Sequence, residues 1–185
     1  MKTLKLTLVL TLFLLLLACS EDSSTSPEKS VSLNGHTYKN EIIGFEISAP
    51  QDWQLEMNKE INGMQALLIG TKSNYSGMAP SFNLISSDAN GMKTSSELLA
   101  ASETYITTNF PDLTIESSKT MNVGGYDCGE LVYSFSYYGV NLKQKQLLFL
   151  CGTKISVAVT FTAGKYSYES AVPDFDTIIN SLKML

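Results

Sequence analysis

The chain has 185 residues, with 18 acidic residues against 13 lysines, no arginine, and a formal net charge of −5. Its length is that of one ordinary domain, and an acidic chain without arginine lacks the bidentate phosphate contact that nucleic-acid binding favours. One histidine and three cysteines are too few for most histidine-dependent or Cys/His metal chemistry, so we expect neither a cofactor nor a metal site.

Residues 1–18 have the pattern of a secretory signal peptide. Lys2 and Lys5 give a charged start, and residues 6–17 are apolar apart from two threonines. The apolar run is shorter than the roughly 20 residues that a spanning helix needs. A membrane anchor or an N-terminal core helix is the alternative interpretation.

The end of this run, Leu16-Leu17-Ala18-Cys19, resembles the bacterial lipobox. That resemblance implies that Cys19 receives a diacylglycerol, becomes the first residue after cleavage, and carries a further acyl chain such as palmitate. Each buried CH₂ contributes ~0.8 kcal/mol, so such an anchor holds a protein durably on a membrane. Ser20 after the cysteine is similar to outer-membrane sorting, which predicts the outer membrane of a bacterial envelope, facing either the periplasm or the surface.

Residues 19–32 are predicted to be the lipidated cysteine and a tether. Ser20 to Ser32 reads SEDSSTSPEKSVS, which is too polar to bury enough surface to fold. A modification site is the alternative. A folded domain is expected over residues 33–185.

Alternation and turn signals then predict strands at residues 36–39, 44–48, 64–71, 81–87, 113–121, 126–138, 141–151 and 155–162. Thr94 and Glu97 form a capping box that begins a helix over 95–109, which Pro111 ends. Apolar residues at helical spacing predict a closing helix at 173–184.

Two segments of the domain resemble PsbP-like domains. Residues 44–53 read as a strand followed by Pro-x-x-Trp, and residues 175–183 read FDTIINSLK, similar to that family's closing helix. The resemblance covers about residues 37–185. It implies an α+β fold with a central antiparallel sheet of about six strands and helices on both faces. The family's functions do not transfer, because the matching positions are structural.

The cysteines Cys128 and Cys151 lie on two strands predicted to form a hairpin. If Gly139-Val140 is a two-residue type II′ loop, these cysteines face each other in register. An oxidising compartment then predicts a disulfide between them, although strict alternation makes this a hydrogen-bonded pair, the less favourable geometry. Two buried free thiols are the alternative.

No catalytic motif, phosphate loop or metal signature is present in the sequence. We therefore expect a non-enzymatic binding or assembly module whose partner is an envelope protein or a small ligand, beside the membrane itself. Trp53, Tyr75 and Met78 are candidates for an interaction surface, because exposed Tyr and Met are typical of interfaces. Large aromatic residues usually bury most of their area, which favours the other interpretation, that Trp53 plugs the sheet edge and Tyr75 packs on its loop. A small hydrolase or isomerase with an unmarked site remains the other function class.

Overall fold

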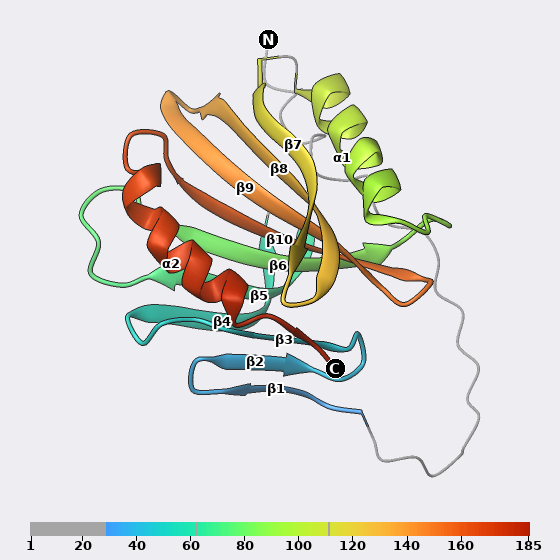
Figure 1. Ribbon diagram of the computed structural model, residues 1–185. Coiled ribbons are helices and arrows are strands. Elements are labelled where there is room, and N and C mark those ends of the chain that lie inside the picture. The colour runs from blue at the N-terminus through green and yellow to red at the C-terminus, as the bar shows by residue number, and fades with distance from the viewer. Residues whose placement is uncertain (1–28, 62, 111) are drawn as a thin grey trace.

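The computed structural model describes residues 29–61, 63–110 and 112–185. Two antiparallel sheets and two helices make up this part of the chain (Figure 1). The seven-stranded sheet has the order β4-β5-β6-β10-β9-β8-β7, and the four-stranded sheet has the order β1-β2-β3-β11. The elements are β1 (Val31–Asn34), β2 (Thr37–Asn40), β3 (Phe45–Ser48), β4 (Trp53–Ile61), β5 (Met64–Lys72), β6 (Ser81–Asp88), α1 (Ser95–Asn109), β7 (Thr114–Val123), β8 (Tyr126–Tyr137), β9 (Val140–Cys151), β10 (Ile155–Gly164), α2 (Tyr168–Asn180) and β11 (Lys183–Met184).

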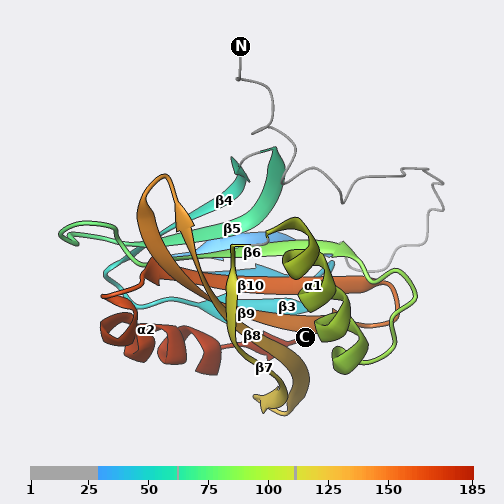
Figure 2. The same ribbon diagram turned by 90° about the horizontal axis from the view of Figure 1, so that it is seen from above.

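The two helices cover opposite faces of the seven-stranded sheet (Figure 2). Successive residues of a strand point to opposite faces, and β8 shows this directly. Leu131 and Tyr133 pack with α1, whereas Cys128 packs in the larger core with α2. The fold therefore has an apolar layer on each side of one curved sheet.

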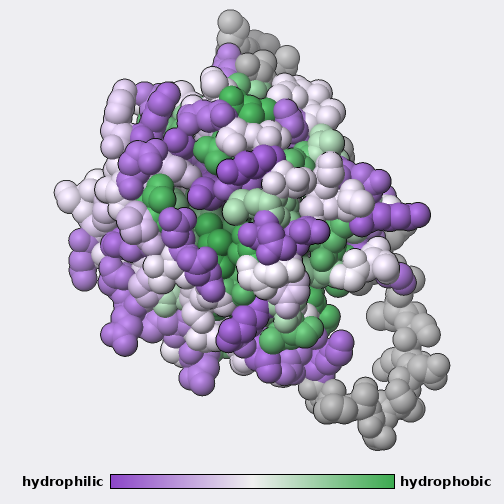
Figure 3. Space-filling model, viewed as in Figure 1, coloured by the Kyte–Doolittle hydropathy of each residue, from purple (hydrophilic) through white to green (hydrophobic). Residues whose placement is uncertain are grey.

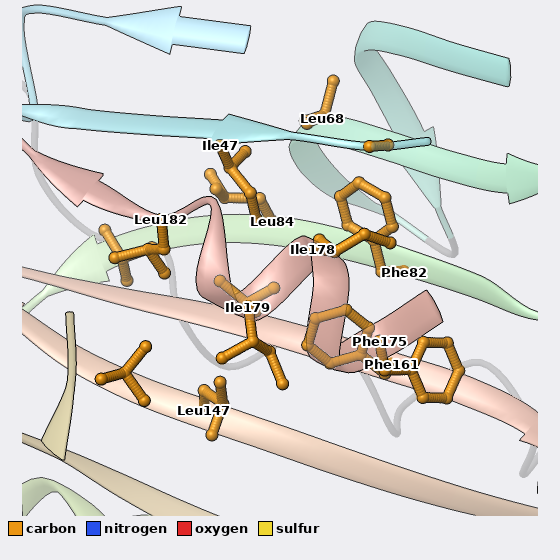
Figure 4. Packing of buried hydrophobic residues seen from close by; sticks show 14 of the residues in the cluster. Ile47, Leu68, Phe82, Leu84, Leu147, Phe161, Phe175, Ile178, Ile179 and Leu182 are labelled. Atoms are coloured by element: carbon orange, nitrogen blue, oxygen red, sulfur yellow. The ribbon is translucent and has the colours of Figure 1, made fainter. Parts of the chain in front are cut away.

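The larger core lies between the seven-stranded sheet, α2 and the four-stranded sheet (Figure 4). Phe175 of α2 lies at the centre of this core. The centroid of its ring is 4.8 Å from that of Phe161 and 6.3 Å from that of Trp53. Aromatic side chains bury large areas and pack edge to face at such distances. This core fixes the strand ends, and with them the loops at either end of the sheet.

The antiparallel sheet, its helix on each face and most strand positions agree with the sequence-based prediction. The capping box at Thr94 and Glu97 is present, and α1 spans the predicted residues. The number of strands is wrong, because the sheets hold seven and four strands in place of about six. The β4 strand was not predicted: Trp53, Leu55 and Met57 alternate with polar residues, but the consecutive polar residues 58–60 interrupt the pattern.

The closing helix also differs from the prediction. It begins at Tyr168, so Pro173 lies inside it, and it ends at Asn180. Tyr168 and Ala171 extend the buried stripe of Phe175 toward the N-terminus, and this burial outweighs the proline penalty. Lys183 and Met184 form β11 against β3 instead of a last helical turn.

The predicted disulfide is not present, because the hairpin register differs by two residues. Tyr137 pairs with Val140, so the loop residues are Tyr138 and Gly139, with φ of 48° and 79°. Positive φ at both positions is the type I′ turn, in place of the predicted type II′. Cys128 consequently faces Phe149, and both Cys128 and Cys151 are free.

The predicted signal peptide, the lipobox with Cys19, and most of the tether lie outside the described residues. The end of the predicted tether is in the fold, since β1 begins at Val31, two residues before the expected domain boundary. Among the described residues, no helix has the length and apolar character needed to cross a membrane.

Candidate functional site

Four connections meet at one end of the seven-stranded sheet, at the left of Figure 1. The pairings of Ser81 with Thr162 and of Leu142 with Gly164 bring the β5–β6 loop, the β8–β9 hairpin tip and the β10–α2 turn to this end. The β3–β4 turn joins them, since the Ser73 amide donates to the Asp52 carbonyl. We call its aromatic and apolar side chains the tyrosine rim, consisting of Tyr75, Met78, Tyr137, Tyr138, Val140 and Tyr166.

The segments that carry the rim have an unusual composition. Residues 73–80, 136–141 and 165–167 consist mostly of tyrosine, serine, glycine and asparagine, and none of these residues is acidic. This is the composition of antibody binding loops, in which tyrosine provides rigid contact area and the small polar residues provide adaptable hydrogen bonds. The same composition recurs in three segments that are distant in sequence and adjacent in the fold.

Five of the six rim side chains are exposed although they are large, and the Tyr75 side chain is half-buried. Tyr166 is 92% exposed, Tyr138 74%, and Tyr137 and Val140 about half. Single exposed apolar residues are normal on a protein surface, whereas a group of them at one end marks an interaction site. Tyrosine suits such a site because it combines an apolar ring with a polar tip.

Tyr138 lies in a backbone conformation that its side chain disfavours. Its φ of 48° is left-handed, where glycine and asparagine are common and a bulky residue is an outlier. Its ring packs edge to face against the neighbouring Tyr137 ring, with centroids 4.6 Å apart and planes at 75°. Folding alone favours asparagine at this position, and asparagine is what the other described non-glycine residues with positive φ are.

Hydrogen bonds hold two of the rim segments together. The Lys165 amide donates to the Asn141 carbonyl at 2.8 Å, and the Ser136 hydroxyl donates to the Asn141 side chain at 2.8 Å. Tyr166 therefore lies next to the hairpin tip that carries Tyr138. These hydrogen bonds hold the backbones of the two segments beside each other.

A cluster of charged side chains lies on the α2 face of the sheet, near the β8–β9 hairpin tip. Lys143 on β9 lies 2.9 Å from Glu116 and 3.3 Å from Glu169, and its ammonium is 4.5 Å from the ring centre of Tyr168. The hydrogen bond from Lys143 lowers the pKa of Glu116. Burial, followed by the nearby carboxylates, raises the pKa of the Tyr168 hydroxyl. This cluster is a set of paired charges that ties α2 to β7 and β9.

The structure separates the residues predicted to form an interaction surface. Trp53 is 1% exposed and packs between Phe82 and Phe175, so it is not part of an interaction surface, and the interpretation that it is buried is correct. Met78 is exposed and Tyr75 half-buried, and both lie on the rim. The larger part of the rim, on β8, β9 and the turn before α2, was assigned to strands and a loop without any binding role.

Two observations bear on metal and thiol chemistry among the described residues. No group of three His, Cys, Asp or Glu within them is arranged to hold a metal ion. Burial raises the pKa of Cys128 to about 12 and that of Cys151 to about 11, so both thiols stay protonated near neutral pH. The chemistry that the rim supports is contact binding through aromatic rings, phenol hydroxyls and loop amides.

Comparisons with known proteins place the fold. No protein-family model matches the sequence, and no curated protein matches it. LpqN of Mycobacterium tuberculosis, described as involved in cell envelope biogenesis, has a TM-score of 0.58 at 15% identity over 76% of this chain and 82% of its own. A Pseudomonas aeruginosa protein of unknown function, PA94, has a TM-score of 0.59 at 14% identity over 85% and 97%.

Cyanobacterial PsbP from Synechocystis matches with a TM-score of 0.55 at 10% identity, covering 89% of this chain and 98% of that one. Identities this low establish a shared fold and no shared activity. The PsbP-like fold expected from residues 44–53 and 175–183 is therefore confirmed.

Proposed function

We propose that this protein is a lipid-anchored, non-enzymatic binding module of a bacterial envelope, and that its tyrosine rim contacts a protein partner. The observation that carries the proposal is Tyr138, a largely exposed aromatic residue kept at a left-handed position of a hairpin tip. A residue that costs folding energy and is exposed to solvent is retained for a contact outside the chain.

The envelope location is supported by the N-terminal sequence. Cys19 ends a lipobox-like stretch behind a charged start and an apolar run. The likeness of the fold to LpqN, a protein described as involved in cell envelope biogenesis, is in agreement with that location. Within the envelope, we propose attachment to the outer membrane, an assignment that rests on Ser20 alone.

The type of partner is inferred from the chemistry of the rim. Tyrosine is enriched among the residues that dominate protein–protein binding energy, and exposed rings of this kind usually fill pockets on the partner. The absence of acidic residues in the rim segments leaves Lys165 as their one charged side chain. The rim is accordingly suited to a folded protein surface with pockets for aromatic rings.

The anchor is tested by mass spectrometry of the protein extracted from membranes with detergent. We expect Cys19 to be the N-terminal residue and to carry acyl chains. Cys19→Ser should leave the precursor uncut or release the domain from membranes. An unmodified N-terminus at any other residue contradicts the lipid anchor.

The rim is tested by affinity capture from native membranes with the lipidated chain and a Tyr138→Ser/Tyr166→Ser variant. We expect one stoichiometric envelope protein with the parent chain and at least about a 30-fold weaker interaction with the variant, the size of a two-residue hot spot of ~2 kcal/mol. Tyr105→Ser on α1 is the matched control, since Tyr105 is also exposed but lies outside the rim. Equal recovery with all three chains contradicts the assignment of the rim.

A further inference from the structure

The opposite end of the domain carries a second group of exposed apolar side chains. Ile42 is 58% exposed and Leu185 56%, with Val31 at 38% and with Ile43 and Met184 half-buried beside them. We call these five residues the tether-end patch. Figure 3 shows apolar side chains gathered at the lower right, beside the point where the described chain begins.

The strand pairings place these residues at one edge. Val31 pairs with Asn40, Asn40 with Phe45, and Phe45 with Met184, so β1, β2, β3 and β11 all have this end in common. The last residues of the chain are fixed there. The Leu185 amide donates to the Gly44 carbonyl at 2.9 Å, and the Tyr126 hydroxyl donates to the Met184 carbonyl at 3.2 Å.

A hollow of about 250 Å³ opens within the patch. Most of its wall is apolar, and it is lined by Ile43, Gly44, Tyr126, Leu150, Cys151, Gly152, Met184 and Leu185. The Cys151 thiol is 3.9 Å from the Met184 sulfur, so two soft, apolar side chains form its floor. A concave apolar surface of this kind is suited to hydrocarbon.

The N-terminal segment enters the domain at the same point. The Glu41 amide donates to the Ser30 carbonyl at 2.9 Å, and the Glu41 carboxylate accepts from the Ser30 amide at 3.1 Å. Glu41 directly precedes Ile42. The Glu41 carboxylate lies 2.6 Å from the Lys39 ammonium, so the charge next to these apolar residues is paired.

The length of chain before Ser30 limits how far this end can lie from a lipid on Cys19. At ~3.6 Å per residue the chain from Cys19 to Ser30 reaches at most about 40 Å. A link of that length gives an effective concentration on the order of millimolar, which is enough for a patch of weak intrinsic affinity to bind.

The patch and the tyrosine rim lie at opposite ends of the same strand. Strand β9 runs from Val140 in the rim to Cys151 in the wall of the hollow. Its 12 residues span about 36 Å at ~3.3 Å per residue. When β9 stands upright on a surface with the Cys151 end down, the Val140 end lies up to about that distance above it.

We infer that the tether-end patch seats on the lipid bilayer that holds the anchor, so that the domain stands on the membrane with the tyrosine rim facing away from it. This orientation rests on the proposed lipid anchor. The bilayer is the occupant because the chain length keeps this end within about 40 Å of it, and because moving exposed isoleucine and leucine side chains out of water is favourable. A partner on the rim then lies in the space beyond the anchoring membrane.

The test uses the full lipidated chain reconstituted in phosphatidylcholine vesicles. Ile42→Cys in a Cys151→Ala background carries a fluorophore at the patch, and Met78→Cys in the same background is the matched control on the rim. Cys128 has no exposed surface and will not be labelled, and the diacylglycerol on the Cys19 sulfur blocks that thiol. Nitroxide-bearing phosphatidylcholine then quenches whichever label is in contact with lipid.

We expect quenching at position 42 to exceed quenching at position 78 several-fold, and Leu185→Asp in the Ile42→Cys chain to reduce it. Equal quenching at the two positions, or stronger quenching at 78, overturns the orientation. Mass spectrometry of the same sample separates this failure from that of the proposed function. Acylated Cys19 with equal quenching refutes only the orientation, whereas unmodified Cys19 refutes the anchor on which it rests.

Discussion

Replacing Tyr138 with asparagine separates a binding role from a structural one. The substitution gives Asn-Gly at the two positions with φ of 48° and 79°, the preferred sequence for a type I′ turn. Relief of the left-handed strain is worth ~1 kcal/mol, since that conformation costs an ordinary residue about 1–2 kcal/mol. Loss of the contact with Tyr137 costs ~0.5 kcal/mol, the low end for an aromatic pair because both rings are exposed.

The expected net effect of Tyr138→Asn is a gain of about 0.5 kcal/mol in the free energy of unfolding, or a Tm higher by about 1–2 °C for a domain of this size. Urea unfolding of the full chain measures it. Tyr137→Asn is the matched control, because it removes the same ring pair without relieving strain and should lose about 0.5–1 kcal/mol. A loss of more than 1 kcal/mol for Tyr138→Asn refutes the argument that stability does not explain this tyrosine.

Three further predictions follow from the core and the charged cluster. A Cβ on Gly70 would lie 2.1 Å from the Phe82 ring, which is buried, so Gly70→Ala should lower the free energy of unfolding by about 2–3 kcal/mol in urea titration. Thiol titration of the denatured, unreduced protein should find the two cysteines of the domain free, and the native protein should react slowly because burial keeps both thiols protonated. The lowered pKa of Glu116, paired with Lys143, adds stability that is present above about pH 4.3 and lost as the pH falls through the folded-state pKa. Glu116→Gln should therefore remove about 0.5–1 kcal/mol at pH 7 and much less at pH 3, and an equal loss at both pH values contradicts that pairing.

The elements that sequence reasoning predicted well are those with strong local signals. Thr94 and Glu97 determine where α1 begins, and alternation along residues 126–137 and 155–164 determines β8 and β10. The start of α2 was missed because Pro173 resembles a first helical residue. Burial of Tyr168 against Phe175, a contact of the folded core, extends the helix past that proline.

The candidate site depends on information that no local pattern contains. Tyr75 and Tyr166 come to the same end of the sheet only because β6 and β9 both pair with β10. The turn at Tyr138 was misread because glycine also suits the first position of a type II′ turn, and a tyrosine with positive φ is rare. The recurrence of Tyr, Ser, Gly and Asn in three loop segments is the one sequence signal that could have indicated the rim.

The measurement that tests the account most directly is photo-crosslinking of the full lipidated protein in cells, with a benzophenone amino acid at position 138. The account predicts one saturable crosslink to an envelope protein from position 138, none from the matched position 105 on α1, and loss of the crosslink in a Tyr166→Ser background. Absence of a crosslink at 138, or the same crosslinks from 138 and 105, contradicts the claim that the tyrosine rim binds a partner.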